Sequence, residues 1–453
     1  MPAICRSALS ARPRVPGFLL AILVLLAGCG RVDSIRDALD PPSAHERYAE
    51  SLRSADLAAT ALGSAWLGAA DRALASPLSV TLPFRETAYF PSEDATAAGY
   101  RFSVPQGQRL VITLESDAAG TATLFADLFE IGEEGDPAEH VESIEAGETG
   151  LTVEPDEDRT YLLRLQPELL RSGRFTVTIR TTASLAFPVA GRDSRAIQSR
   201  FGAPRDGGAR DHHGIDIFAQ RGTPVVAAAT GTVGRVGTTR LGGNVVWLRD
   251  AERGQSLYYA HLDSQAVTGG ERVISGDTLG FVGNTGNART TPPHLHFGIY
   301  RRGKGPLDPY AFVFEPPDDP PEVTADTSEL GEWWRVAQSE ARLRIAPDAN
   351  APTVDTLPQH TALRVLGASR SWYRVRLPDG ASGYIIASAL EDAATPVRRE
   401  RVSEPGLVLD RPGDGAPVVD SVASGATVPV LGLFAGYALV TADSGRTRWV
   451  GLE

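Results

Sequence analysis

The chain has few cysteines and no long hydrophobic run. Its two cysteines among 453 residues are Cys5 and Cys29. The apolar stretch from Phe18 to Ala27 is too short for the roughly 20 residues that a membrane-spanning helix needs. The chain also lacks a basic stripe with interleaved aromatic residues, and its pI is near 5.3. Nucleic acid is therefore not an expected partner.

The apolar stretch near the N-terminus has the features of a secretory signal. Arg12 and Arg14 precede it, and it ends in Leu26-Ala27-Gly28-Cys29. This ending resembles a bacterial lipoprotein processing site. Cleavage before Cys29 would expose this cysteine, which is then acylated. The alternative is an ordinary signal peptide with a chance cysteine. Since Cys5 would leave with the signal, the mature chain would hold no disulfide.

Length and charge suggest several domains with different surfaces. A chain of 453 residues with 42% hydrophobic residues is long enough for about three domains with their own cores. Residues 81–180 carry 8 basic and 19 acidic residues, whereas residues 191–314 carry 15 basic and 10 acidic residues. The second region is thus basic within a chain of net charge −12, which favours an anionic polymer as its target.

Five of the eight histidines lie between residues 212 and 296. Apart from His261, they form two patterns, His212-His213-Gly214-Ile215-Asp216 and His294-Leu295-His296. Because side chains alternate along a strand, we expect His212 and Asp216 on one face, and His294 and His296 on one face. Two histidines and a carboxylate match a catalytic zinc site, which needs three protein ligands and one position open to water. The pattern predicts a zinc hydrolase.

A structural role is the alternative for each of these histidines, since a single histidine on a strand is more often a hydrogen-bonded, partly buried side chain. The joint pattern favours the metal. Gly214 leaves backbone room beside the proposed ion, and apolar residues alternate with the polar ones and would bury the opposite face. These apolar residues are Ile215, Ile217, Leu295, Phe297 and Ile299.

Further motifs surround the histidines between Phe201 and Ile299. They are His212-x-Gly214-x-Asp216, Thr223-Pro224-Val225, Gly231-Thr232-Val233, Tyr259-Ala260-His261-Leu262, Gly283-Asn284-Thr285-Gly286 and His294-Leu295-His296-Phe297. Together they resemble the lysostaphin-like (LytM-type) peptidoglycan zinc metalloendopeptidases. The resemblance implies an antiparallel β domain that binds one Zn²⁺ per chain.

The same resemblance assigns roles to individual residues. It makes His212, Asp216 and His296 the zinc ligands, and it makes His261 and His294 the catalytic pair beside the attacking water. Such histidines can accept or donate protons at neutral pH. His213 has no role in the motif and is expected to be a solvated neighbour.

The chain departs from the common family pattern at two places. Thr291-Pro292-Pro293 stands where many relatives have Thr-Gly-Pro, and Gly298 stands where many have Glu after the Phe. Neither position is a ligand, and the proline pair would hold the preceding residue extended. The family also includes members that have lost ligands and activate other wall hydrolases. Here every ligand is present, which favours a working enzyme.

Residues before the histidine region predict a helix followed by strands. Residues 43–75 are rich in leucine and alanine, which favours a helix that Pro77 ends. Alternating short segments then follow with Gly and Pro between them, which is typical of a β-sandwich. These segments are residues 100–104, 109–114, 161–165 and 175–179.

The C-terminal part resembles two bacterial SH3-like modules, which are often appended to wall hydrolases. The first contains Ser371-Trp372-Tyr373-Arg374-Val375-Arg376 and Gly383-Tyr384-Ile385, and residues 400–453 repeat its layout in a diverged form. Trp372 and Tyr373 would bind wall peptides if exposed; the alternative is that they fill the core of the small barrel. For Trp449 we expect the core.

The expected protein is mainly β and multidomain. The expected parts are a lipoprotein signal peptide (1–28), a helical stalk (29–79), a β-sandwich (80–182), a LytM-type metallopeptidase domain (183–314), a linker rich in Pro and acidic residues (315–332) and two SH3-like β-barrels (333–392 and 400–453).

Three functions fit this organisation. The favoured one is a zinc endopeptidase that hydrolyses the peptide crosslinks of peptidoglycan, with the SH3-like modules raising the local substrate concentration. The second is a non-hydrolytic LytM-type activator of a cell-wall amidase, and the third is a structural wall-anchoring lipoprotein. Possible partners besides peptidoglycan are another cell-wall hydrolase or a divisome protein.

The expected place of action is the cell envelope, with a lipid anchor in a membrane facing the periplasm. Gly30, rather than Asp, follows Cys29, which is compatible with the outer membrane of a Gram-negative bacterium. We therefore expect cleavage of a D-alanyl to diaminopimelate crosslink, whereas oligoglycine bridges would suit another kind of wall.

Overall fold

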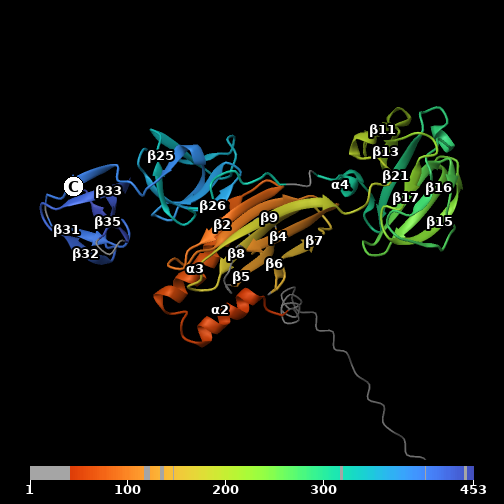
Figure 1. The fold of residues 1–453 in the computed structure, drawn as a ribbon. Helices are drawn as coiled ribbons and strands as arrows, with labels where there is room; N and C mark the ends of the chain where they lie inside the picture. Colours follow the sequence, from red (N-terminus) through yellow and green to blue (C-terminus); the bar gives the residue numbers. More distant parts are fainter. Residues whose placement is uncertain are drawn as a thin grey trace, which may run out of the picture. The chain divides into compact units, whose positions relative to one another are not determined.

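The computed structural model describes residues 41–116, 123–132, 137–145, 147–316, 320–403, 405–442 and 446–452. The expected signal peptide and Cys29 lie outside these residues. Within them, no helix is both long and apolar enough to pass through a membrane. Strands dominate the chain (Figure 1), which confirms the expectation of a mainly β, multidomain protein.

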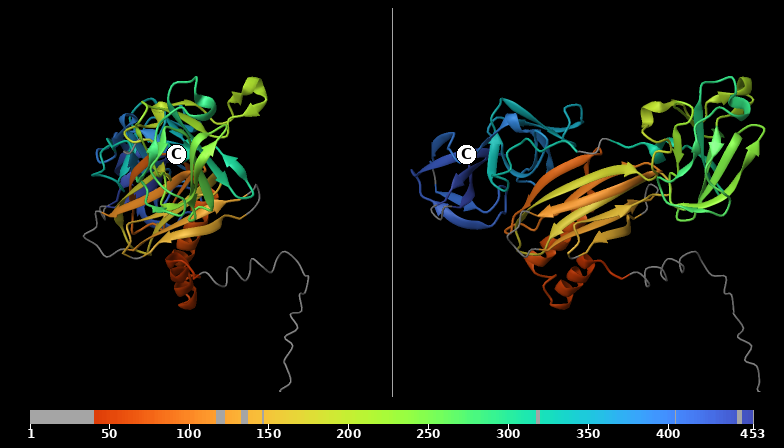
Figure 2. Two further views of the ribbon diagram at one scale, coloured as in Figure 1. Left: turned by 90° about the vertical axis from the view of Figure 1, so that its right-hand side faces the viewer. Right: turned by 45° about the vertical axis from the view of Figure 1, so that its right-hand side comes forward.

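Two helices begin the described chain, α2 (Ala44–Ser54) and α3 (Ala61–Ala75). A capping box starts α2, because the Ser43 hydroxyl accepts from the Glu46 N–H while the Glu46 carboxylate accepts from the Ser43 N–H. In α3, Trp66 is buried and its indole N–H donates to the carbonyl of Pro167 in the sandwich. Both helices lie beside the sandwich in Figure 2. Residues 43–75, expected as a stalk or a packing element, thus pack against the sandwich.

A β-sandwich follows, made of two sheets around one core. The core forms because alternate residues of each strand face inward; in β3, for example, Tyr100, Phe102 and Val104 are buried. The first sheet has the order β1 (Leu78–Ser79), β3 (Ala98–Val104), β8 (Arg159–Pro167), β5 (Leu124–Ile131) and β6 (Glu139–Ile144). The second contains β2 (Phe84–Phe90), β9 (Gly173–Ala183), β4 (Gln108–Ser116) and β7 (Gly150–Val153).

The second sandwich sheet continues into the first SH3-like domain. Strand β2 pairs with β26 (Ala362–Ser369) of that domain, with Thr87 opposite Ala368 and Ala88 opposite Gly367. The remaining strands of that domain are β23 (Trp333–Val336), β24 (Glu340–Arg344), β25 (Thr353–Pro358), β27 (Trp372–Arg376), β28 (Ser382–Ile386) and β29 (Leu390–Asp392). The two domains therefore share backbone hydrogen bonds.

A buried charge network accompanies this strand pairing. Glu86 of β2 is fully buried, and its carboxylate accepts from Arg374 Nε at 2.7 Å, from the Tyr100 hydroxyl at 2.7 Å and from the Tyr384 hydroxyl at 2.8 Å. Two of these donors come from the SH3-like domain. A buried carboxylate needs such partners, because burying a charge without them is costly.

The SH3-like domain packs its aromatic residues inward and takes in part of the expected linker. Tyr373 is only 2% exposed and belongs to the core, and Trp372 is 8% exposed. These positions favour the alternative in which the pair fills the barrel. Ala325 and Leu330, within the expected linker, are buried in the same core.

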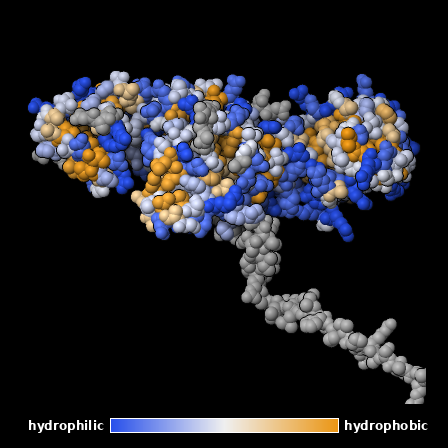
Figure 3. Space-filling view, turned by 60° about the horizontal axis from the view of Figure 1, so that its bottom comes forward, coloured by the Kyte–Doolittle hydropathy of each residue, from blue (hydrophilic) through white to orange (hydrophobic). Residues whose placement is uncertain are grey.

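The last six strands form a sheet of their own. Trp449 is buried in it and contacts Trp333, as expected for a core residue. Leu407, Val418 and Val419 are exposed, and Figure 3 shows hydrophobic atoms gathered on this part of the chain. In sheet order the strands are β30 (Arg398–Arg401), β33 (Thr427–Phe434), β34 (Tyr437–Thr441), β35 (Thr447–Gly451), β31 (Gly406–Leu409) and β32 (Val418–Val422).

The histidine region folds around one curved antiparallel sheet. One face packs on an apolar core that includes Ile215, Tyr259, Leu295 and Phe297, and the other face carries the histidines. In sheet order the strands are β10 (Ile197–Ser199), β13 (Ile215–Phe218), β21 (His294–Arg301), β17 (Gln255–Leu262), β16 (Gly243–Asp250), β15 (Gly231–Thr239) and β19 (Arg272–Val273), with β22 (Gly305–Leu307) beside β21. The smaller elements are β11 (Pro204–Arg205) with β12 (Arg210–Asp211), β14 (Pro224–Val226) with β20 (Thr278–Phe281) and β18 (Ser264–Gln265), and α4 (Tyr310–Val313).

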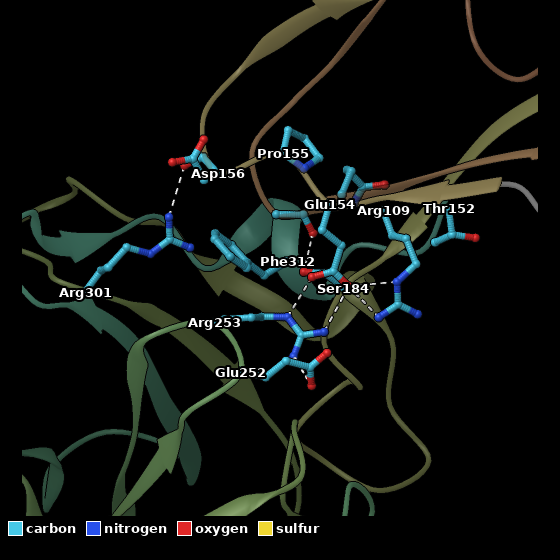
Figure 4. A pocket seen from close by; sticks show the side chains of 12 residues that line it. Arg109, Thr152, Glu154, Pro155, Asp156, Ser184, Glu252, Arg253, Arg301 and Phe312 are labelled. Atoms are coloured by element: carbon cyan, nitrogen blue, oxygen red, sulfur yellow. Dashed lines mark hydrogen bonds and ion pairs between the residues drawn. The ribbon is translucent and has the colours of Figure 1, made fainter. Parts of the chain in front are cut away.

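Ion pairs join this region to the sandwich. Arg253, in the turn between β16 and β17, donates two hydrogen bonds to Glu154, at 2.8 and 2.9 Å, and Arg109 binds the same carboxylate. These residues line a hollow of about 660 Å³ that also includes Arg301 and Phe312 (Figure 4). Arg301 ends β21, whereas His294 and His296 begin it. The sandwich thus contacts the sheet at the end away from the histidines.

Candidate metal centre and active site

Three of the expected ligands meet at one point. His212 Nε2 lies 3.0 Å from Asp216 Oδ1 and 2.9 Å from His296 Nδ1, and His296 Nδ1 lies 3.0 Å from Asp216 Oδ1. Among the described residues, this trio could hold a metal ion. The three expected ligands are therefore brought together by chain segments about 80 residues apart.

The donor set suits a zinc ion. His212 Nδ1 faces the carbonyl oxygen of Arg200 at 2.8 Å, and since a carbonyl has no proton to give, Nδ1 must be the protonated nitrogen. Nε2 of neutral His212 therefore presents a lone pair toward Asp216 and His296. Two nitrogens and one carboxylate oxygen are ligands that zinc prefers, and a cation between them would remove their mutual repulsion.

Strand pairing positions two of the ligands, and a loop positions the third. Asp216 of β13 lies directly opposite His296 of β21 in the antiparallel ladder. His212, in contrast, precedes β13 and is not part of it. The expectation that strand alternation alone places His212 on the face of Asp216 is therefore wrong. Its position depends on the loop that ends at Gly214.

Gly214 is required by close packing, as expected from its position beside the proposed ion. A Cβ at this position would lie 2.4 Å from the carbonyl oxygen of Phe297 and 2.8 Å from Cε1 of the His296 ring. Any side chain would push the His296 ring away from the other two ligands. The loop can thus carry His212 to the site only with a glycine here.

The two expected catalytic histidines lie beside the ligands. Nδ1 of His294 lies 2.9 Å from the carbonyl of Pro292, and Nδ1 of His261 lies 2.9 Å from the carbonyl of Thr285. Each Nδ1 must carry the proton, so each Nε2 can accept one. His294 Nε2 is 4.0 Å from Asp216 Oδ1. The ring centroids of His261 and His294 lie 5.1 Å apart.

An unusual backbone conformation turns His261 toward the site. Leu257 and Tyr259 face the core, so simple alternation would send His261 there as well. His261 instead has φ of 62°, in the left-handed region, and Leu262 takes the next core position. The strand changes phase by one residue, which costs strain but brings His261 beside His294 and His296.

The electrostatics keep the ligands in the forms that bind metal. Burial alone would raise the pKa of Asp216, but its close contacts with His212 and His296 hold it well below its ordinary value. Burial lowers the pKa of His296, and burial with the neighbouring imidazoles lowers the pKa of His261 to about 4. The carboxylate is thus ionised and both imidazoles are neutral near pH 7.

Arg205 is a site residue that the sequence did not reveal. Its Nη2 donates to the second carboxylate oxygen of Asp216, Oδ2, at 2.7 Å and to the hydroxyl of Ser199 at 2.6 Å. Oδ2 is thereby occupied and Oδ1 is left for a metal. No local pattern marks Arg205, because the contact depends on how the β11–β12 hairpin folds over β13. His213, as expected, is exposed and stacks on Phe201.

Comparisons with known families match two parts of the chain, one of which contains this donor set. Residues 210–309 match peptidase family M23, and residues 339–391 match the bacterial SH3 domain. The chain therefore contains an M23 peptidase domain, which includes all five clustered histidines, and a bacterial SH3 domain. The LytM-type resemblance is confirmed at the level of these domains.

Curated relatives are similar over the M23 region. The L-Ala--D-Glu endopeptidase of Bacillus subtilis is 37% identical over 28% of this chain and 41% of its own length. The peptidoglycan DD-endopeptidase ShyC of Vibrio cholerae is 37% identical over 24% of this chain and 26% of its own length. The DD-carboxypeptidase/endopeptidase Mpg of Neisseria meningitidis is 39% identical over 24% of each chain. The chain thus spans less than half the length of these relatives.

Proposed function

We propose that the protein is a zinc-dependent endopeptidase that hydrolyses peptide crosslinks of bacterial peptidoglycan. The observation that carries this proposal is the meeting of His212, Asp216 and His296 beside the imidazole rings of His261 and His294. The name of one relative, a peptidoglycan DD-endopeptidase, supports a wall peptide as substrate, and the three names together specify different bonds.

The residues of the site divide the chemistry between them. When bound by the three ligands, zinc supplies Lewis-acid activation of water and of the scissile carbonyl. His261 and His294 orient the attacking water and accept its proton, since each offers an unprotonated Nε2. After the proton is accepted, the resulting imidazolium can donate a hydrogen bond to the developing oxyanion or a proton to the leaving amine.

Digestion of purified wall sacculi tests the activity. The zinc-loaded full chain is expected to release soluble, crosslink-cleaved fragments, and a chelator is expected to abolish their release. Mass spectrometry of the fragments identifies the bond, for which a D-alanyl to diaminopimelate crosslink is the expectation. Stoichiometric zinc binding without any release would favour the alternative, a non-hydrolytic activator of a cell-wall amidase.

Single substitutions test the two histidines. His261→Ala and His294→Ala are each expected to lower turnover by at least about 100-fold while zinc remains bound. His213→Ala is the matched control. His213 is exposed and adjacent in sequence to a proposed ligand, and its ring stacks on Phe201. If both site variants kept the turnover of the parent protein with zinc bound, the assignment would be wrong.

The membrane tether is a separate part of the proposal. Cleavage before Cys29 and acylation of that cysteine would hold the enzyme to a membrane that faces the periplasm. Incorporation of labelled palmitate in cells tests it, with Cys29→Ala expected to lose the label. An unlabelled parent protein would refute the lipid anchor and leave the peptidase proposal standing.

A further inference from the structure

Three aromatic side chains lie beside the metal centre on the same face of the sheet. They are Trp247, Tyr258 and Tyr300, here called the aromatic surface, and all three are partly exposed. The Trp247 ring centroid lies 4.5 Å from that of Tyr258 and 5.2 Å from that of Tyr300. The Tyr258 ring in turn meets His296 edge to face at 5.8 Å. The aromatic surface is thus continuous with a proposed metal ligand.

The strand register sets the distance of this surface from the metal centre. Trp247 pairs with Tyr258, and Tyr258 pairs with Gly298, so these residues form one row across the sheet. Gly298 lies two residues beyond His296 on β21. Two residues along a strand cover about 6.8 Å. An extended peptide that runs along β21 would therefore place a residue two positions from the cleaved bond over this row.

Gly298 makes the aromatic surface possible. A Cβ there would lie 3.0 Å from the carbonyl oxygen of His213 and 3.1 Å from Cε2 of Tyr300. A longer side chain would displace the tyrosine or the loop.

The charges around the aromatic surface are positive. Arg235 pairs with Trp247 in the next strand, and its charge acts on Tyr258. Arg249 pairs with Ser256, which pairs with Tyr300, so a second arginine follows in the next row. Both arginines are exposed.

Carboxylates on these strands do not offset the two arginines. In β13, β15, β16, β17 and β21 the acidic residues are Asp216 and Asp250. Asp216 belongs to the proposed metal centre. Asp250 is fully buried and accepts a hydrogen bond from Gln255. The exposed charge on this face therefore favours an anionic ligand.

We infer that the aromatic surface with Arg235 and Arg249 binds the substrate, and that this substrate is an acidic peptide with free carboxylates, not an uncharged glycine bridge. The rings cover aliphatic parts of the peptide, and the arginines attract its carboxylates. This inference rests on the proposed function, because it names the substrate class of the same site.

Calorimetric binding to the chelated full chain tests the inference without turnover. The probes are a synthetic L-alanyl-γ-D-glutamyl tetrapeptide with free carboxylates, the same peptide with its carboxylates amidated, and capped pentaglycine. The free acid is expected to bind most tightly, and its advantage over the amide should shrink as salt is raised. Equal affinity for the acid and the amide would overturn the inference.

Substitutions separate the two parts of the surface. Arg235→Gln is expected to weaken binding of the free acid about threefold and to leave the amide unchanged, as for an exposed ion pair. Trp247→Ala is expected to weaken both peptides about tenfold, whereas Trp247→Phe, which keeps a ring, should retain most of the affinity. Arg101→Gln is the control, since Arg101 is an exposed arginine on β3 of the sandwich, outside the histidine-bearing sheet.

Digestion of wall sacculi by the zinc-loaded parent protein distinguishes this inference from the proposed function. Suppose that the parent protein digests the sacculi but that Arg235→Gln and Trp247→Ala both bind the peptides as the parent does. This result would overturn the inference and leave the proposed function standing. Selective binding of the acidic peptide without digestion would overturn the function and leave the surface as a binding site.

Discussion

Neutralising one buried carboxylate should destabilise two domains at once. Glu86 belongs to the sandwich, but two of its three donors, Arg374 and Tyr384, belong to the SH3-like domain. Burial and the charge of Glu86 raise the pKa of Tyr100 and of Tyr384, so both hydroxyls remain protonated donors. Glu86→Gln keeps the shape of the side chain and removes its charge.

The size of the effect follows from the burial of the network. Glu86 is fully buried and Arg374 is 7% exposed, so water cannot replace the lost partner. Removing one partner of such a pair costs about 3–5 kcal/mol, because the other charge is left uncompensated. For a cooperative unit of about 200 residues, this corresponds to a fall in Tm of about 6–20 °C.

Differential scanning calorimetry of the full chain measures the change. We expect one endotherm for the sandwich and the SH3-like domain together, since they share a sheet and this network, and we expect it to move as a whole in the Glu86→Gln variant. Arg374→Gln should lower the same endotherm. In the double variant the losses should not add, because the buried charge is gone.

Glu93→Gln is the matched control for Glu86→Gln. Glu93 also links the two domains, through Arg364 at 2.8 Å, but its side chain is 58% exposed. Such a pair contributes at most about 1 kcal/mol. A Tm shift in Glu86→Gln no larger than in this control, or separate melting of the SH3-like domain at an unchanged temperature, would contradict a network that couples the two domains.

Three further predictions concern the metal centre. Arg205→Ala removes the donor to Asp216 Oδ2 and is expected to weaken zinc binding about 10- to 100-fold in a chelator competition; unchanged affinity would show that Arg205 does not orient the ligand. Gly214→Ala brings a methyl group against the His296 ring and should destabilise the peptidase domain by about 1–3 kcal/mol, measured by thermal melting; an unchanged melt would contradict the close packing. At a free zinc concentration 100 times the Kd, the bound ion should raise the free energy of unfolding of that domain by about 2.7 kcal/mol, and its removal should lose this amount. The melting transition of the sandwich should not move; a shift of both transitions would contradict an effect confined to the peptidase domain.

Local sequence patterns were sufficient for parts of the fold and site that depend on one segment. His294 and His296 share a face because both lie on β21, where alternation holds. Gly214 stood out next to a histidine in a short motif, and its packing against His296 explains why no larger residue fits.

The order of amino acids along the chain was enough to determine the M23 motifs, the mainly β character and the identity of the expected ligands. Each of these depends on residues close to one another in the sequence. The tertiary structure alone decided that His261 leaves the core phase of its strand, that Arg205 binds Asp216, and that Glu86 joins the sandwich to Arg374 of the SH3-like domain. These features depend on backbone strain and on contacts between segments far apart in the chain. Periodicity within one segment carries no information about such contacts.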